Sequence, residues 1–539
     1  MKRKAILALV LALALVFALF SACAKSGTEA ASGSDSSTAA NTSSGDNAGS
    51  DPDTEDTDAE AATDEEIAEI VMYIVDMNVT SATSDEHKQA IEDAINAITE
   101  PQIGVHVTFK TSQTAEYMTG MPLDIAGGET LDIVGVFPMA PINLTSLYSN
   151  NQLLDISPYL ETEGQDILSV AGPYLDAVTI AGGIYMVPNI RNYASSEYMI
   201  WIADWIDELG YTDLVQNMTT WAEFEEVMNA IHDKYGVAAM AAQGSGEDTR
   251  VLLHGTGGIT FSGTGDLNNA LVTDNVGDNL YVVATDPDTN KAYNLYTDPH
   301  FAEGCETTKR WYDEGLIYAD AAVTQDDVAV QVKNEVAAGY IVTSELGVEV
   351  AKESQCDHRM YATKLCDAMV TSGVVTRFGL AVAVNSEEPA AAVRFLNLLM
   401  TSKELNNLLD YGIEGEDWQM LDTGEAGLTE NSQFHGMDFM LGNAFLAESW
   451  DGNGADYRER CREANDAAPI SSYLGFSFDT SELANTVAAI TSVQQEYLPG
   501  LTCGLYEEEN YNTFLSKLES AGINDYIAEA QTQIGRAHV

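Results

Sequence analysis

Short apolar runs alternate with helical patterns in the part of the chain that follows residue 66. Residues 67–75 form an apolar run, and residues 85–98 then place apolar side chains at the spacing of one helix face. Residues 105–109 alternate between apolar and polar, and residues 131–137 form a further apolar run. Strands separated by helices predict βαβ units, so we expect an α/β fold with a mainly parallel sheet flanked by helices.

The end of the third predicted strand is a candidate binding position. Open parallel sheets bind ligands beyond the carboxyl ends of their strands. Residues 135–139 lie at such an end, and Phe137 is the aromatic side chain among them. We therefore include Phe137 among the candidate ligand-binding residues.

Residues 182–196 predict a segment in which the chain leaves one sheet for another. Glycines at its start allow a tight turn, and Pro188 lacks the backbone donor that a central strand needs. Arg191, Asn192 and Tyr193 follow, and an extended crossing places such side chains in a cleft between two lobes. The alternative is an ordinary strand that ends in a polar loop.

The pattern beyond this segment predicts a second set of elements. Expected strands are residues 196–202, 280–284, 292–296, 335–343 and 378–384, and expected helices are residues 204–209, 301–314, 389–400 and 514–533. Thr220, with acidic residues in the next turn, predicts the N-cap of a further helix that runs to about residue 234. The turn at 286–290 imitates a calcium loop, but Lys291 and Thr297 stand where that loop needs Gly and Glu, so we exclude calcium there.

The N-terminus reads as an export signal. Three basic residues precede an apolar run at 5–20, and Ser21, Ala22 and Cys23 follow. This resembles a bacterial lipobox, which implies a lipoprotein signal peptide at 1–23 and acylation of Cys23, such as palmitate; plain secretion is the alternative. Residues 24–65 are polar and acidic, which predicts a disordered tether.

Composition narrows the class of partner and of chemistry. Lys and Arg number 24 against 84 Asp and Glu, a net charge of −60, which disfavours nucleic acid and anionic lipid head groups. No His/Cys cluster, phosphate-binding loop or nucleophile elbow occurs, so we expect no metal, no cofactor and no catalytic residue. Cys356 and Cys366 either pair or remain free thiols, and both alternatives stay open.

Several later segments resemble one family of binding proteins. They are Tyr-Gly-Ile-Glu-Gly-Glu-Asp-Trp at 411–418, Gly-Asn-Ala-Phe at 442–445, Leu-Gly-Phe-Ser-Phe-Asp-Thr at 474–480 and Gln-Glu-Tyr-Leu-Pro-Gly at 495–500. In this order they resemble the extracellular solute-binding lipoproteins of ABC importers, family 1 type, with the C-terminal region known as DUF3502. The resemblance covers about residues 67–533.

The resemblance implies a two-lobed, periplasmic-binding-protein-like clamp of type II with additional C-terminal helices. Lobe 1 would comprise residues 66–190 and 378–410, and lobe 2 residues 191–377 and 411–533. Three crossings would fall near residues 188–193, 377–386 and 411–418. It also implies a monomer, lipid-anchored at the extracellular face of a bacterial cell membrane, that delivers a carbohydrate, an oligosaccharide by default, to ABC permease subunits.

The crossings supply the remaining candidate residues. Arg377 begins the second crossing, Trp418 ends the third, and Trp450 is a further flat aromatic side chain. The other tryptophans outside the first strand of lobe 2 are expected in the core: Trp205, Trp221 and Trp311. Tyr193 and Trp418 either stack on a sugar or pack the hinge.

Two other functions remain as alternatives. Glu414 and Glu416 are a possible acid/base pair of a surface glycoside hydrolase. A glycan-binding adhesin or sensor without transport is the other, and the sequence leaves the ligand's identity open. The residues at 534–539 match the translation of a widely used sequencing adapter, so we expect a non-native tail there.

Overall fold

The fold is that of a computed structural model. It describes residues 67–76, 78, 83–245, 249–253, 260–278, 280–367 and 369–537. Residues Glu65–Val539 form one compact unit, which is described here. The predicted signal peptide, Cys23, the tether and residues 538–539 of the predicted tail lie outside the described residues.

The first sheet has the strand order β2-β1-β3-β14-β6. Its strands are β1 (Ala68–Val75), β2 (Val105–Ser112), β3 (Ile133–Val136), β6 (Val187–Pro188) and β14 (Gly379–Val382). β2, β1 and β3 are parallel, as predicted, whereas β14 runs antiparallel to β3 and β6. Pro188 lies in the edge strand, where a sheet tolerates proline.

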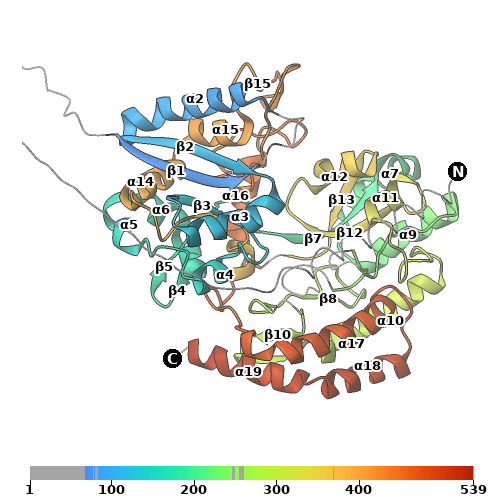
Figure 1. Cartoon of the computed structure of the whole chain (residues 1–539). Helices are drawn as coiled ribbons and strands as arrows, with labels where there is room; N and C mark the ends of the chain where they lie inside the picture. The colour runs from blue at the N-terminus through green and yellow to red at the C-terminus, as the bar shows by residue number, and fades with distance from the viewer. Residues whose placement is uncertain are drawn as a thin grey trace, which may run out of the picture. The chain divides into compact units, whose positions relative to one another are not determined.

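Helices cover this sheet because each carries one apolar face. They are α2 (Asp85–Ile103), α3 (Thr114–Gly127), α4 (Leu144–Ser149), α5 (Ser157–Glu163), α6 (Gln165–Ala171), α14 (Pro389–Leu399) and α15 (Lys403–Tyr411). In α2 the N-cap Ser84 accepts a hydrogen bond from the N–H of His87, and Ile91 and Ile95 are buried. α2 lies beside α15, although about 300 residues separate them in the chain (Figure 1).

The second sheet has the order β12-β7-β13. Its strands are β7 (Ser196–Ile202), β12 (Gly339–Ser344) and β13 (Met360–Lys364). β12 and β13 are joined by α12 (Val348–Cys356) and run the same way, but β7 lies between them and is antiparallel to both. Parallel bridges of Ala238 with Ala337 and of Met240 with Ile317 lie beyond the three named strands.

The prediction of mainly parallel sheets therefore needs one correction. β7 is the first strand after the chain leaves the first sheet, and β14 is the first strand after it returns. Each of these strands starts beside the end of a neighbour: Ser196 is paired with Ser344, and Gly379 with Val136. The strand that enters a sheet from the other one is thus antiparallel, and the carboxyl ends of β3 and β12 lie at the crossings.

The second core is the larger cluster of buried apolar side chains. Its helices are α7 (Ala203–Leu209), α8 (Thr212–Asn217), α9 (Trp221–Tyr235) and α10 (Pro299–Asp313), and a hairpin joins β10 (Val283–Asp286) to β11 (Lys291–Asn294). Helix α11 (Val328–Lys333) packs in a smaller cluster with Ile200 and Tyr340 of the second sheet. Thr220 caps α9 in a capping box with Glu223, as its sequence predicted. Trp221 and Trp311 are buried in this core, also as predicted.

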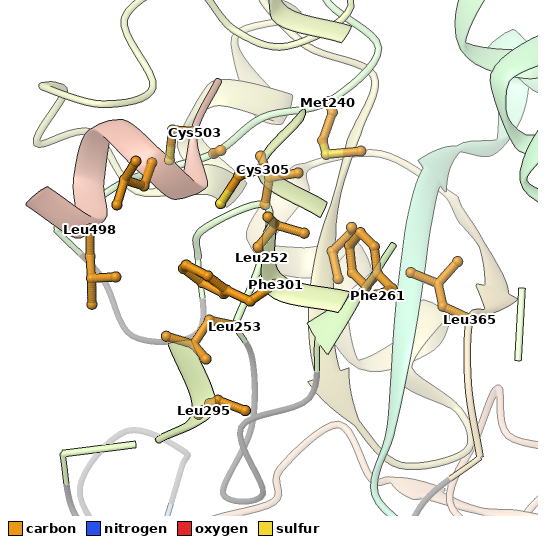
Figure 2. Close-up of a cluster of buried hydrophobic side chains, with 14 of the residues drawn as sticks. Met240, Leu252, Leu253, Phe261, Leu295, Phe301, Cys305, Leu365, Leu498 and Cys503 are labelled. Atoms are coloured by element: carbon orange, nitrogen blue, oxygen red, sulfur yellow. The ribbon is translucent and has the colours of Figure 1, made fainter. Parts of the chain in front are cut away.

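The C-terminal helices belong to the second core. They are α17 (Ala484–Thr502), α18 (Glu508–Ser520) and α19 (Ile523–Ala537), so the helix predicted at 514–533 is broken at Gly522, where φ is +96°. Figure 2 shows Leu498 and Cys503 near Phe301 and Cys305 of α10. The C-terminal region is therefore an integral part of this core.

The structure differs from the predicted boundary at residue 411. The segment that follows carries β15 (Trp418–Met420) and β16 (Ala426–Leu428), and its Leu441 belongs to the first core. Asp417 contacts His87 of α2, which holds this segment on the first core. The chain reaches the second core only after α16 (Tyr457–Ala467), because the aromatic residues that join that core begin at Tyr473.

The cysteines outside the predicted signal are free and buried: Cys305, Cys356, Cys366, Cys461 and Cys503. Of the two alternatives for Cys356 and Cys366, the structure therefore shows two free thiols and not a disulfide. Within the part of the chain that the structure describes, no helix combines the length and apolar character needed to cross a bilayer.

Candidate ligand-binding site

The first crossing is a buried segment fixed by α16. The side chain of Asn465 accepts the N–H of Tyr193 at 2.6 Å and donates to the carbonyl of Arg191 at 2.6 Å. The amide of Asn192 contacts the sulfur of Cys461 at 3.7 Å. Tyr193 is fully buried, and its hydroxyl donates to the carbonyl of Asn189. Asn192 and Tyr193 thus pack within the crossing. For Tyr193 this corresponds to the hinge-packing alternative and not to stacking on a sugar.

Arg191 links this crossing to the end of β12. Its guanidinium forms an ion pair with Glu345 and donates to the carbonyls of Asn192 at 3.1 Å and Val374 at 3.2 Å. The same group lies 5.5 Å from the ring centre of Tyr193 and 5.6 Å from that of Phe378. Arg191 is only 3% exposed. Its positive charge is therefore already paired with a carboxylate of the protein itself.

Glu345 interacts with residues of the first and the second crossing, which are Arg191 and Arg377. It follows β12 directly, and its side chain keeps 28% of its exposure despite the ion pair. Desolvation by the surrounding protein raises the pKa of Glu345, and the negative charge of Asp438 raises it further. The positive charges of Arg191 and Arg377 lower it. Glu345 therefore lies close enough to Arg191, Arg377 and Asp438 for the charges of all three to act on its carboxylate.

A second charged group lies on the segment between residues 411 and 458. Arg458 pairs with Asp438 and also contacts the hydroxyl of Tyr411 at 2.6 Å and the carbonyl of Glu448 at 3.1 Å. Tyr411 packs against Trp450, with ring centres 4.8 Å apart. Because Asp438 also acts on Glu345, this group is electrostatically continuous with the first one.

Aromatic rings lead outward from the first core to this charged region. Phe137 is buried and meets Phe378 edge to face at 6.2 Å, and Phe378 meets Phe439 at 5.5 Å. Phe439 is 37% exposed, and its carbonyl accepts a hydrogen bond from Asn189 of the first crossing. The ring that reaches solvent at the end of β3 is therefore Phe439, while Phe137 supports it from below.

The tryptophans that were singled out form a separate cluster with Tyr411. Trp418 is 4% exposed, and its indole N–H donates to the carbonyl of Gly412 at 3.1 Å. Trp450 is half-buried, and its ring lies 4.0 Å from that of His435. Burial lowers the pKa of His435, which favours the neutral imidazole. Trp418 is therefore packed inside the protein, whereas Trp450 packs on Tyr411, whose hydroxyl accepts a hydrogen bond from Arg458.

The structure brings Arg191 and Arg377 together around Glu345 and keeps Trp418 apart from them. Sequence reasoning missed five residues of this region, which are Glu345, Phe378, Asp438, Phe439 and Arg458. Phe378 had a usable signal, since it follows Arg377 at the start of a predicted strand. The acidic residues had none, because 84 acids in one chain make each of them unremarkable by position.

A cavity of about 210 Å³ lies elsewhere, in the first core between α2, the ends of β1 and β2, and α15. Its walls are apolar, with Ile91, Phe109 and Leu409 among them, and Asp76 and Lys88 lie at its rim. None of the charged groups described above contributes to its lining. We therefore do not take it as the binding site.

Two α/β cores, joined by buried crossings at the carboxyl ends of their strands, define a two-lobed binding protein. The chain belongs to the family described as bacterial extracellular solute-binding protein, whose model matches residues 93–412. A second model, the domain of unknown function DUF3502, matches residues 472–537. The family predicted from the sequence is confirmed.

Relatives with known names or structures agree with this fold. A carbohydrate ABC transporter substrate-binding protein of Streptococcus pneumoniae serotype 4 (strain ATCC BAA-334 / TIGR4) is 22% identical over 445 residues, 79% of this chain and 83% of the relative. The crystal structure of the N-glycan transport solute binding protein NgtS from Streptococcus pneumoniae superposes with a TM-score of 0.70 at 18% identity, covering 87% of this chain and 98% of that one. An extracellular solute-binding protein from Bifidobacterium longum subsp. infantis gives 0.60 at 16% identity, covering 87% and 98%.

Proposed function

We propose that this protein captures an oligosaccharide outside the cell and delivers it to an ABC permease. The S. pneumoniae relative is named as a carbohydrate ABC transporter substrate-binding protein. Similar folds are solved with glycans: NgtS with Man5GlcNAc, at a TM-score of 0.57, and FusA with kestose, at 0.55. These relatives support a carbohydrate, but they do not select one for this chain.

One observation carries the proposal: an exposed aromatic ring and charged side chains gather where the two cores meet. Phe439 offers a flat apolar surface, and Arg377, Glu345 and Asp438 offer donors and acceptors around it. A sugar ring has an apolar face of C–H groups and an edge of hydroxyls, which match these two kinds of surface. The neighbourhood of Phe439 is therefore our candidate binding position.

The test is a thermal-shift screen of the purified protein against a glycan panel, followed by calorimetry on the hits. A ligand at about 100 times its dissociation constant stabilises the folded state by roughly 2.7 kcal/mol. Phe439→Ala should weaken binding of each hit, whereas Leu123→Ala, an exposed apolar residue on α3 of the first core, should leave it unchanged. A panel of neutral and acidic oligosaccharides without a single hit contradicts the proposal.

The same samples distinguish the enzyme alternative. A glycoside hydrolase would release new reducing ends from the oligosaccharide during incubation, and a binding protein returns it intact. Glu414 and Glu416 lie on the loop before β15, and Glu416 is 64% exposed. No observation on this loop favours an acid/base pair, so we expect intact ligand.

We further propose that Cys23 anchors the protein to the outer face of the cell membrane. The support is the sequence alone, because Cys23 lies outside the described residues. Cys23→Ser should move the protein from the membrane fraction to the medium without changing its melting temperature. Retention of this variant in the membrane fraction would contradict a lipid anchor.

A further inference from the structure

Arg377 is a half-buried cation at the second crossing. Among the residues that the structure describes, neither a hydrogen bond nor an ion pair involves its guanidinium, and its recorded interaction is electrostatic, with Glu345. The described arginines that are engaged with other protein groups are Arg191, Arg250, Arg310, Arg359, Arg394, Arg458, Arg460 and Arg462. Arg536 near the C-terminus is the other described arginine without such a bond. In a chain with 84 acidic residues, a free guanidinium at a crossing is unusual.

The charges around Arg377 leave it uncompensated. Glu345 already forms an ion pair with Arg191, and Asp438 already forms one with Arg458. Asp410 is buried beside Asp438 and Arg458, and burial raises its pKa well above the ordinary value, which favours its neutral form. Three guanidinium groups therefore face two paired carboxylates, and the surplus positive charge is that of Arg377.

Arg377 lies at the second crossing, next to the aromatic residues that lead to Phe439. It lies between α13 (Ser372–Val375) and β14, and Phe378, the next residue, joins the aromatic series that ends at Phe439. A guanidinium presents planar paired donors that fit a carboxylate in a bidentate arrangement. A neutral hydroxyl satisfies only one donor and leaves the charge without a counter-ion.

We propose that the oligosaccharide recognised here carries a carboxylate, as uronic or sialic acids do, and that Arg377 pairs with this group. This rests on the proposed function and adds to it the chemical class of the sugar. One sugar ring would lie on Phe439, and the acidic group would lie toward Arg377. Glu345, held by Arg191, then limits the site to one anion, because a second carboxylate would meet its negative charge.

The test measures affinity for acidic oligosaccharides beside neutral counterparts of the same length and linkage. Suitable probes carry a single carboxylate, such as 3′-sialyllactose and an aldotriouronic acid, each with its carboxyl-reduced form. We expect at least one acidic probe to bind roughly 10- to 100-fold more tightly than its reduced form, as charged hydrogen bonds do. This difference should shrink as salt is raised, because the paired charges are partly screened.

Variants of Arg377 separate the charge from the fold. Arg377→Gln should abolish the difference between acidic and reduced probes, and Arg377→Lys should keep part of it, because lysine retains the charge but not the planar fork. Melting curves without ligand should be unchanged in both, since Arg377 has no bond to lose.

The outcomes separate this inference from the proposed function. Binding of the reduced probes as tightly as the acidic ones overturns the carboxylate and leaves the oligosaccharide proposal standing. An acidic preference that persists in Arg377→Gln overturns the role of Arg377. Absence of binding by every acidic and neutral glycan overturns the proposed function, and this inference with it.

Discussion

The imidazole of His87 contacts the carboxylate of Asp417 across 330 residues of chain, with Nε2 2.9 and 2.8 Å from the two oxygens. Asp417 is fully buried and also accepts the backbone N–H groups of Ile413 at 2.9 Å and of Gln433 and Phe434 at 3.0 Å. One carboxylate thus organises the loop after α15 and fastens it to α2. This contact is the reason that the segment lies on the first core.

Asp417→Ala should therefore destabilise the protein strongly. Removing one partner of a buried, hydrogen-bonded pair costs about 3–5 kcal/mol, because the remaining groups lose their partner without regaining water. Denaturant unfolding of the full chain measures the loss. Glu416→Ala is the matched control: its carboxylate is exposed and 3.9 Å from the same imidazole, so we expect a change within about 0.5 kcal/mol. Equal effects of the two variants would show that Asp417 is not the anchor.

This contact also shows what the sequence was able to predict. Strands and helices were predicted where the signal is local, such as the apolar run of β1 or the capping pair Thr220 and Glu223 of α9. The segment after residue 411 was assigned to the wrong core, since nothing near Asp417 in the chain reveals His87. Tertiary pairs between distant residues leave no periodic pattern.

The same difference between local signals and distant contacts explains which residues of the candidate site were predicted. Arg191 and Arg377 were predicted because they lie at expected crossings, where the topology itself indicates a cleft. Glu345, Asp438 and Phe439 were missed, since they lie in irregular segments that the fold alone brings to the crossings. The identity of Trp418 as an aromatic residue was informative, but its indole is turned into the protein by the bond to Gly412.

A second stability prediction concerns the C-terminal helices. Tyr526 of α19 donates from its hydroxyl to Asp278 at 2.6 Å, and Asp278 also accepts the N–H groups of Val282 at 2.6 Å and Val283 at 2.8 Å. Tyr526→Phe should lower the free energy of unfolding by about 1.5–3 kcal/mol, the range for hydrogen bonds to charged groups. Ser516→Ala on the exposed face of α18 is the control. An unaffected Tyr526→Phe variant would argue that the hydrogen bond to Asp278 contributes little to stability.

Asp410 predicts a pH dependence of stability. Both of its carboxylate oxygens lack a hydrogen-bond donor among the described residues, and burial, reinforced by Asp438, raises its pKa well above the unfolded value of about 3.9. An acid whose pKa is raised on folding contributes stability below its unfolded pKa, and this contribution is lost as pH rises through the folded pKa. Asp410 therefore makes the folded state progressively less stable toward neutral pH.

Asp410→Asn should remove this contribution, since the amide is uncharged throughout. The free energy of unfolding of wild type minus that of the variant should be level below about pH 4, the unfolded pKa, and should fall as pH rises above it. Taking the difference cancels the repulsion among the many other acids, which both proteins share. A difference that rises with pH would contradict a buried, protonated Asp410.

The last prediction separates Trp418, which the sequence singled out as a candidate, from Phe439, which it did not. Trp418 is buried with its N–H satisfied, so Trp418→Ala should lower the free energy of unfolding by about 3–5 kcal/mol and change the affinity of the folded protein little. Phe439 is 37% exposed beside the crossings, so Phe439→Ala should weaken glycan binding by about 0.5–1.5 kcal/mol with a small change in stability. Calorimetry with the best glycan of the screen, beside melting curves without ligand, measures both quantities. If Trp418→Ala loses affinity while keeping its melting temperature, the ligand lies against the cluster of Tyr411 and Trp450, and the binding position moves from Phe439 to that cluster.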